Sequence, residues 1–238
     1  MKKLFIFNAG HSFPDSLKTH GDFDSWIIRE SQITEDQLIK VEVQHGQALP
    51  DFKDCAGVII TGSHEMVTDN LPWSLAIEAW LRDSVEHKIP VLGICYGHQL
   101  IAKALGGLVD YHPQGIEIGS VAVELKARAQ EDAIFKSLPQ HFPAHATHSQ
   151  SVRSLPENAV HLASNDFEKN HAFRVGNCIW GVQFHPEFNT EVMKLYINKQ
   201  IPAIQQSGQI AQALEKQVVE TPAASQVLRN FVALTKQA

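Results

Sequence analysis

Residues 93–97 constrain the fold of this chain more than any other segment, and they read Gly-Ile-Cys-Tyr-Gly. A short apolar run, Pro90–Leu92, comes before them, and a helix-like stretch, His98–Leu105, follows. Glycines around a central nucleophile, between a strand and a helix, predict a sharp turn that holds the central side chain clear of the sheet. The sulfur of Cys95 would then lie at a helix N-terminus, where the partial positive charge favours a thiolate. We therefore expect Cys95 to be a catalytic nucleophile.

Short apolar runs alternate with helical patterns through the first half of the chain. Two of the runs, 57–61 and 91–94, are apolar throughout, which is typical of strands buried on both faces. The alternation predicts an α/β fold with a mainly parallel, open, flavodoxin-like sheet and helices on both of its faces. The expected strands are 4–7, 39–43, 57–61 and 91–94, and the expected helices are 73–85 and 98–105, the second one ending at Gly106-Gly107.

The pattern changes after about residue 117. An antiparallel β segment is expected there, with strands at 118–125, 160–163, 172–175 and 178–184 and a hairpin turn at Gly176-Asn177. The chain then becomes helical, with predicted helices at 190–204 (ending near Pro202), 209–219 and 224–236. We expect a single domain over 1–238 in which 189–238 is a helical C-terminal extension. Its apolar positions fit either a cover for the sheet or a surface for a partner.

Composition excludes some classes of function. The chain has 238 residues and a formal charge of −6, which argues against a non-specific nucleic-acid or acidic-membrane partner. No apolar run approaches the ~18 residues of a membrane span. The three cysteines are an odd number with no close pair, which favours a reduced, cytoplasmic setting. Cys55 and Cys178 are expected to be small buried side chains without a chemical role.

A cysteine nucleophile needs a base, and the base needs a group that orients it. Residues 183–187 read Gln-Phe-His-Pro-Glu directly after a strand-like run, which places His185 and Glu187 at a strand end. Because the ends of parallel strands meet at one edge of a sheet, His185 and Cys95 can meet although they lie far apart in the sequence. The N–H of Tyr96 and the loop containing Gly62 are candidate donors to an oxyanion.

The segments Gly-Ile-Cys-Tyr-Gly-His-Gln at 93–99 and Gln-Phe-His-Pro-Glu at 183–187 together closely resemble the class I glutamine amidotransferases, over roughly residues 40–190. The resemblance implies a triad that converts glutamine to glutamate and ammonia through a γ-glutamyl thioester, with the ammonia passed to a separate synthase. It implies no cofactor and no metal. The implied residues are Cys95, His185 and Glu187 in the triad, Gly62 and Tyr96 in the oxyanion hole, and Ser63, Gln99, His148, Ser149 and Gln150 at the substrate.

Within that superfamily the Thr-Gly-Ser loop at 61–63 and the order of the motifs look most like the amidotransferase part of GMP synthases. Two features depart from the pattern. Family members commonly carry an acidic residue where this chain has Gln150, in Thr-His-Ser-Gln at 147–150, beside the amino and carboxylate groups of the substrate. The chain also lacks a Ser-Gly-Gly-x-Asp-Ser pyrophosphatase loop. It therefore cannot activate a nucleotide by itself.

Two alternatives to a glutaminase subunit remain open. The same residues could serve a stand-alone hydrolase or transferase of γ-glutamyl compounds such as γ-glutamyl peptides, with Gln150 marking a different substrate end. The scaffold could instead belong to a binding or regulatory protein, although an intact triad argues against this. The histidines at 141, 145 and 148 have helical spacing for a metal site, but Pro143 argues against a helix there and no metal is expected.

Overall fold

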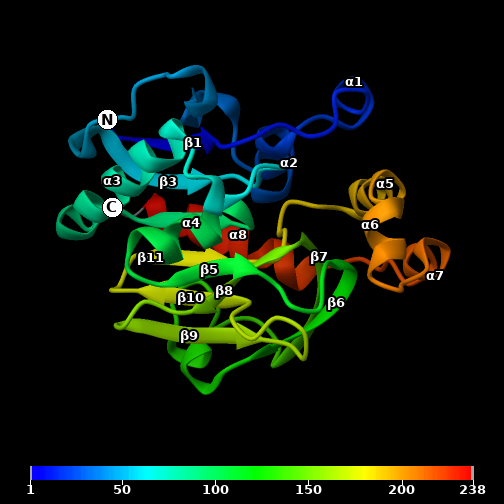
Figure 1. The fold of residues 1–238 in the computed structure, drawn as a ribbon. Helices are drawn as coiled ribbons and strands as arrows, with labels where there is room; N and C mark the ends of the chain where they lie inside the picture. Colours follow the sequence, from blue (N-terminus) through cyan, green and yellow to red (C-terminus); the bar gives the residue numbers. More distant parts are fainter. Residues whose placement is uncertain (1, 237–238) are drawn as a thin grey trace.

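A computed structural model describes residues 2–236 and contains a central sheet of nine strands (Figure 1). The strand order is β2-β1-β3-β4-β11-β10-β9-β6-β7. Neighbours from β2 to β11 are parallel, and neighbours from β11 to β7 are antiparallel. The bounds are β1 Lys3–Asn8, β2 Leu38–Glu42, β3 Cys55–Ile60, β4 Val91–Ile94, β6 Glu117–Leu125, β7 His141–His148, β9 Ala159–Ser164, β10 Ala172–Val175 and β11 Ile179–Val182. The predicted α/β class, with a parallel core and an antiparallel segment, is confirmed.

Helices cover both faces of the parallel part of the sheet. Leu4 and Ile6 of β1 pack in one apolar cluster with residues of α2 and α8, whereas Phe5 and Phe7 pack in a second cluster with residues of α3 and α4. This alternation is what a strand buried on both faces requires. The helices are α1 Leu17–His20, α2 Phe23–Ser31, α3 Pro72–His87, α4 Tyr96–Ala104, α5 Thr190–Lys199, α6 Ile201–Gln206, α7 Ala211–Lys216 and α8 Pro222–Thr235.

The C-terminal helices do two different things. α8 packs over the sheet, where Leu228 and Phe231 are fully buried in the cluster that also contains Ile27 of α2. α5, α6 and α7 lie together to one side, next to β6 (Figure 1). The expected continuous helix 190–204 breaks at Gln200, because Pro202 begins α6 and has no N–H to continue the hydrogen bonds of α5.

Several elements carry no clear pattern in the sequence. β7 runs from His141 to His148 at the edge of the sheet, where a proline such as Pro143 is tolerated, so the three histidines lie on a strand and not on a helix. β5 (Leu108–Tyr111) and β8 (Gln150–Ser154) form a separate two-stranded sheet. Across residues 2–236, the structure contains no helix with the length and apolarity needed to cross a bilayer.

Candidate active site

Cys95 lies at the predicted sharp turn between β4 and α4. Its backbone has φ 50° and ψ −98°, and its N–H donates to the Val182 carbonyl of β11 at 2.9 Å. The other non-glycine residues with positive φ are helix ends in the ordinary left-handed region, whereas the ψ of Cys95 lies well outside it. Such a conformation is strained and persists only where the surrounding structure imposes it.

The two glycines of the motif allow this turn because nothing larger fits. A Cβ added at Gly93 would lie 2.3 Å from the Gly97 carbonyl oxygen, and a Cβ added at Gly97 would lie 2.5 Å from the Ile60 carbonyl oxygen. Both distances are far below van der Waals contact with fixed backbone atoms. The first turn of α4 therefore packs directly on β3 and β4, and this close packing holds the side chain of Cys95 where the strand ends.

His185 and Glu187 follow β11, which is parallel to β4 and paired with it. The His185 Nδ1 atom lies 2.8 Å from a Glu187 carboxylate oxygen, and both side chains are buried. Burial alone would lower the pKa of His185, but the charges of Glu187 and of the Cys95 sulfur outweigh burial and raise the pKa to about 10. The remaining ring nitrogen, Nε2, has no hydrogen-bond partner among the described residues.

A cavity of about 280 Å³ opens onto these groups. Cys95 and His185 both line it, so the structure brings the nucleophile candidate and the base candidate into one space. Of the other residues singled out in the sequence, Ser63, Tyr96, Gln99, His148, Ser149 and Gln150 line the same cavity. Gly62 lies against the histidine, since a Cβ added there would be 3.1 Å from His185 Cε1 and 3.2 Å from Phe23 Cε1.

His148 is buried, and both of its ring nitrogens are engaged with the protein. Nε2 lies 2.8 Å from Glu117, and Nδ1 lies 2.9 Å from the Gln150 backbone carbonyl. Burial lowers the pKa of His148, but Glu117 outweighs burial and raises it. For Glu117 burial works in the raising direction, while His171 and His148 outweigh it and lower the pKa. A protonated His148 can thus donate to both neighbours and fix the strand segment that leads to Gln150.

Gln99 and Gln150 form an amide-lined end of the cavity. The Gln99 amide nitrogen donates to the Gln150 backbone carbonyl at 2.7 Å and to the Gln183 side-chain oxygen at 3.0 Å. The Gln150 amide nitrogen donates to the Thr68 hydroxyl at 2.6 Å, and its side-chain oxygen is buried without a partner among the described residues. With their N–H groups occupied, both glutamines have side-chain oxygens left to accept hydrogen bonds from a bound molecule.

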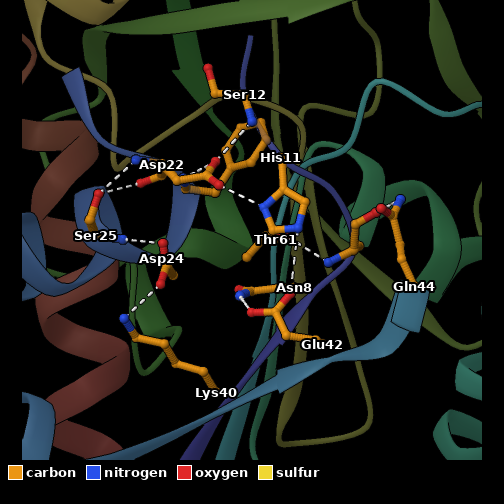
Figure 2. A network of polar contacts seen from close by, with 12 residues as sticks. Asn8, His11, Ser12, Asp22, Asp24, Ser25, Lys40, Glu42, Gln44 and Thr61 are labelled. Carbon is orange, nitrogen blue, oxygen red and sulfur yellow. Dashed lines mark hydrogen bonds and ion pairs between the residues drawn. The ribbon is translucent and has the colours of Figure 1, made fainter. Parts of the chain in front are cut away.

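The loop after β3 is held by a polar network at the neighbouring strand ends (Figure 2). Thr61 accepts the Ala9 N–H at 2.9 Å, and a Cβ added at Gly10 would lie 2.7 Å from the Ser63 Cα, so the loops after β1 and β3 are in contact. Figure 2 shows His11 between Asp22, 2.7 Å away, and Glu42, 3.5 Å away. The hydrogen bond to Asp22 raises the pKa of His11 above its usual range.

One part of the cavity wall is aromatic and was not predicted from the sequence. It is formed by Phe13 from the loop after β1, Phe23 from α2, His64 from the loop after β3, and Tyr196 from α5. α2 did carry a local signal: Asp22 and Ser25 form a reciprocal capping box, and Phe23, Trp26 and Ile27 follow with helical spacing. Tyr196 had none, because it approaches the site only through the packing of α5 against the antiparallel part of the sheet.

A comparison with known protein families now decides the membership. The family described as Glutamine amidotransferase class-I matches residues 22–201, which is most of the chain. The chain belongs to the class I glutamine amidotransferase family. The match spans β4, α4 and β11, and it includes Cys95, His185 and Glu187 together with the amide-lined end.

Individual relatives differ in what they are named for. The chain is 27% identical to gamma-glutamyl peptidase 4 of Arabidopsis thaliana, covering 81% of this chain and 78% of that protein. It is 35% identical to a glutamine-hydrolyzing GMP synthase subunit of Methanococcus vannielii, covering 58% of this chain and 66% of that protein, which is slightly under two thirds. A glutamine amidotransferase structure from Thermotoga maritima superposes with a TM-score of 0.78 over the full length of both chains at 20% identity, which confirms the fold.

Proposed function

We propose that this amidotransferase domain hydrolyses the side-chain amide of glutamine to glutamate and ammonia through a thioester on Cys95. The observation that carries the proposal is the cavity shared by a strained cysteine at a helix N-terminus and a buried His185–Glu187 pair. A cysteine, an imidazole and a carboxylate in this order are the groups that covalent amide hydrolysis requires.

In the first half of the reaction, the Cys95 sulfur attacks the γ-carbon of the substrate amide. The carbonyl oxygen gains negative charge, which the backbone N–H groups of Tyr96 and of the Gly62 loop would receive. Because the pKa of His185 is raised to about 10, the imidazole is protonated at neutral pH and can donate its proton to the departing nitrogen. The carbon–nitrogen bond breaks, ammonia leaves, and the γ-glutamyl group stays on sulfur.

In the second half, water attacks the thioester. His185 has given up its proton and is now neutral, so it accepts one from the water as the new carbon–oxygen bond forms. The carbon–sulfur bond then breaks, glutamate leaves, and the starting pair of thiolate and imidazolium is restored. Glu187 keeps Nδ1 as the donor toward itself in both halves, which leaves Nε2 free for the reacting groups.

We assign the amino and carboxylate end of the substrate to the amide-lined end of the cavity. The side-chain oxygens of Gln99 and Gln150 would accept from the α-ammonium group, and the hydroxyls of Ser149 and Ser63 are polar groups on the same wall. His148 acts indirectly in this scheme, because its ring nitrogens bind Glu117 and the backbone of Gln150.

We infer that the ammonia passes to a separate, cytoplasmic synthase chain. Relatives named as glutamine-hydrolyzing GMP synthase subunits support this assignment, as does the absence from the sequence of a Ser-Gly-Gly-x-Asp-Ser loop for nucleotide activation. A second candidate is hydrolysis of γ-glutamyl peptides. It is supported by an amide at Gln150 instead of an acid, by the aromatic wall on the other side of His185, and by relatives named as gamma-glutamyl peptidases.

One experiment tests both candidates. Ammonia release from glutamine and amino-acid release from γ-glutamyl dipeptides are measured for the wild type and for Cys95→Ala. We expect Cys95→Ala to lose roughly 10³-fold or more of the activity on every substrate that the wild type turns over. Activity on dipeptides but not on glutamine selects the second candidate. Equal rates for the two proteins contradict the assignment of Cys95 as nucleophile.

A further inference from the structure

The cavity has two chemically different ends on either side of Cys95. The amide-lined end is connected by hydrogen bonds among Gln99, Gln150 and Thr68. The other end, which we call the aromatic end, is formed by Phe13, Phe23, His64 and Tyr196. Its rings contact one another: Phe13 lies 4.6 Å from His64 and 5.0 Å from Tyr196 between ring centroids, and His64 lies 5.8 Å from Tyr196.

His185 belongs to the aromatic end. The ring of Phe23 stacks on His185 with centroids 6.2 Å apart and an angle of 18° between the planes, and Phe23 in turn contacts His64. A Cβ added at Gly62 would touch both His185 and Phe23, so little space separates these two rings. Since His185 must protonate the departing nitrogen, whatever is bonded to that nitrogen has to lie on this side of the sulfur.

The aromatic end is also poor in available charge. Desolvation of its ring and the charge of His185 lower the pKa of His64, so this imidazole is neutral at pH 7. The Tyr196 hydroxyl lies 3.3 Å from His64 Nε2 and 3.3 Å from the Ser12 hydroxyl, which occupies its hydrogen-bonding capacity within the protein. Ammonia is small and polar and gains nothing from such a wall, whereas an apolar group does.

The available space fits a molecule larger than glutamine. The cavity volume of about 280 Å³ is close to the lower limit, about 300 Å³, of pockets that hold drug-sized ligands. Phe13 is half-buried and His64 is exposed, so the aromatic end opens to solvent at its outer side. A substrate bound through its glutamyl part can therefore extend outward past His185 between these rings.

Building on the proposed amide hydrolysis, we propose that the aromatic end is a subsite for an apolar or aromatic group on the leaving amine. The substrates it selects are γ-glutamyl amides of hydrophobic amines, with γ-glutamyl-phenylalanine as a representative. The bond that breaks joins the γ-carbon to the amide nitrogen, the amine leaves with a proton from His185, and water supplies the oxygen of the glutamate formed.

The test compares kcat/KM of the full chain for glutamine, γ-glutamyl-glycine and γ-glutamyl-phenylalanine. We expect the phenylalanine dipeptide to exceed the glycine dipeptide by about tenfold or more, as for other apolar groups in apolar pockets. Phe13→Ala should remove most of this preference and reduce kcat/KM for the phenylalanine dipeptide at least ~10-fold more than for the glycine dipeptide. Phe52→Ala is the matched control, because Phe52 is also half-buried but packs against Trp80 and His87, outside the cavity.

Three outcomes overturn the subsite: equal kcat/KM for the two dipeptides, turnover of glutamine alone, or a Phe13→Ala variant that loses the same factor on every substrate. All three leave hydrolysis through Cys95 standing. Absence of any turnover that depends on Cys95 removes the proposed function and the subsite together. The two proposals therefore fail in distinguishable ways. Loss of the dipeptide preference in Phe52→Ala as well would also contradict the subsite, because the effect would then not be local.

Discussion

The strained backbone of Cys95 predicts an unusual order of stability among variants at this position. With φ 50° and ψ −98°, a non-glycine residue here costs about 1–3 kcal/mol. Both Cys95→Ala and Cys95→Gly remove the sulfur, but only glycine relieves the backbone. Glycine loses about 0.4–1 kcal/mol through the greater freedom of its unfolded chain, and about 0.8 kcal/mol more with the buried methyl group. Taking the upper half of the strain range, Cys95→Gly should be more stable than Cys95→Ala by about 1 kcal/mol.

The assay is urea and thermal unfolding of both variants at one pH, followed by circular dichroism. A difference of about 1 kcal/mol corresponds to roughly 2–4 °C in Tm for a chain of this size. Ala79→Gly is the reference: Ala79 is exposed in α3, where the same exchange should cost about 0.5–1 kcal/mol. If Cys95→Gly is less stable than Cys95→Ala by as much as Ala79→Gly is less stable than the wild type, the turn stores no strain and the reasoning is refuted.

Further predictions concern the groups around the triad. Glu187→Gln removes the charge that keeps His185 protonated, so the alkaline limb of the pH–rate profile, set in the wild type by a pKa of about 10, should move to lower pH, and kcat/KM should fall by about 10²-fold or more; an unchanged limb would show that His185 is not the acid. The raised pKa of His185 also predicts that its contribution to stability is complete below pH 6.5 and is lost as the pH rises through about 10, which unfolding of the wild type against Glu187→Gln can measure. Glu117→Gln leaves His148 buried without its carboxylate and should cost on the order of 3 kcal/mol in urea unfolding at pH 7; because the pKa of Glu117 is lowered, the difference should shrink as the pH falls below about 4.5, and a constant difference would contradict the ion pair. Gly62→Ala places a Cβ 3.1 Å from His185 and should reduce kcat at least about tenfold with little change in Tm, so full activity would exclude a tight fit at this loop.

The parallel half of the fold and the triad geometry could be predicted because their signals are local. Gly93 and Gly97 flank Cys95 within one turn, and His185 follows an apolar strand directly. General rules for parallel sheets then bring the two strand ends together, because β4 and β11 are parallel neighbours. Only the pairing itself, which joins strands far apart in the chain, needed the structure.

The rest of the site has no local signal. Phe13 and Tyr196 contact each other across almost the whole length of the chain, and neither sits in a motif. β7 was hidden by Pro143, which its position at the edge of the sheet tolerates. The pairing of His148 with Glu117 depends on the register between β6 and β7, which a sequence pattern does not specify. Tertiary packing decides these features, and they shape the substrate end of the site more than its chemistry.

The most direct test of the central claim is to trap the acyl-enzyme. The full chain is mixed with glutamine or with a γ-glutamyl dipeptide, quenched in acid during turnover, and measured by intact-protein and peptide mass spectrometry. The account predicts a γ-glutamyl adduct on Cys95 that hydroxylamine removes and that is absent from Cys95→Ala. Turnover of the same substrate by Cys95→Ala at the wild-type rate, or an adduct on any other residue, would contradict it.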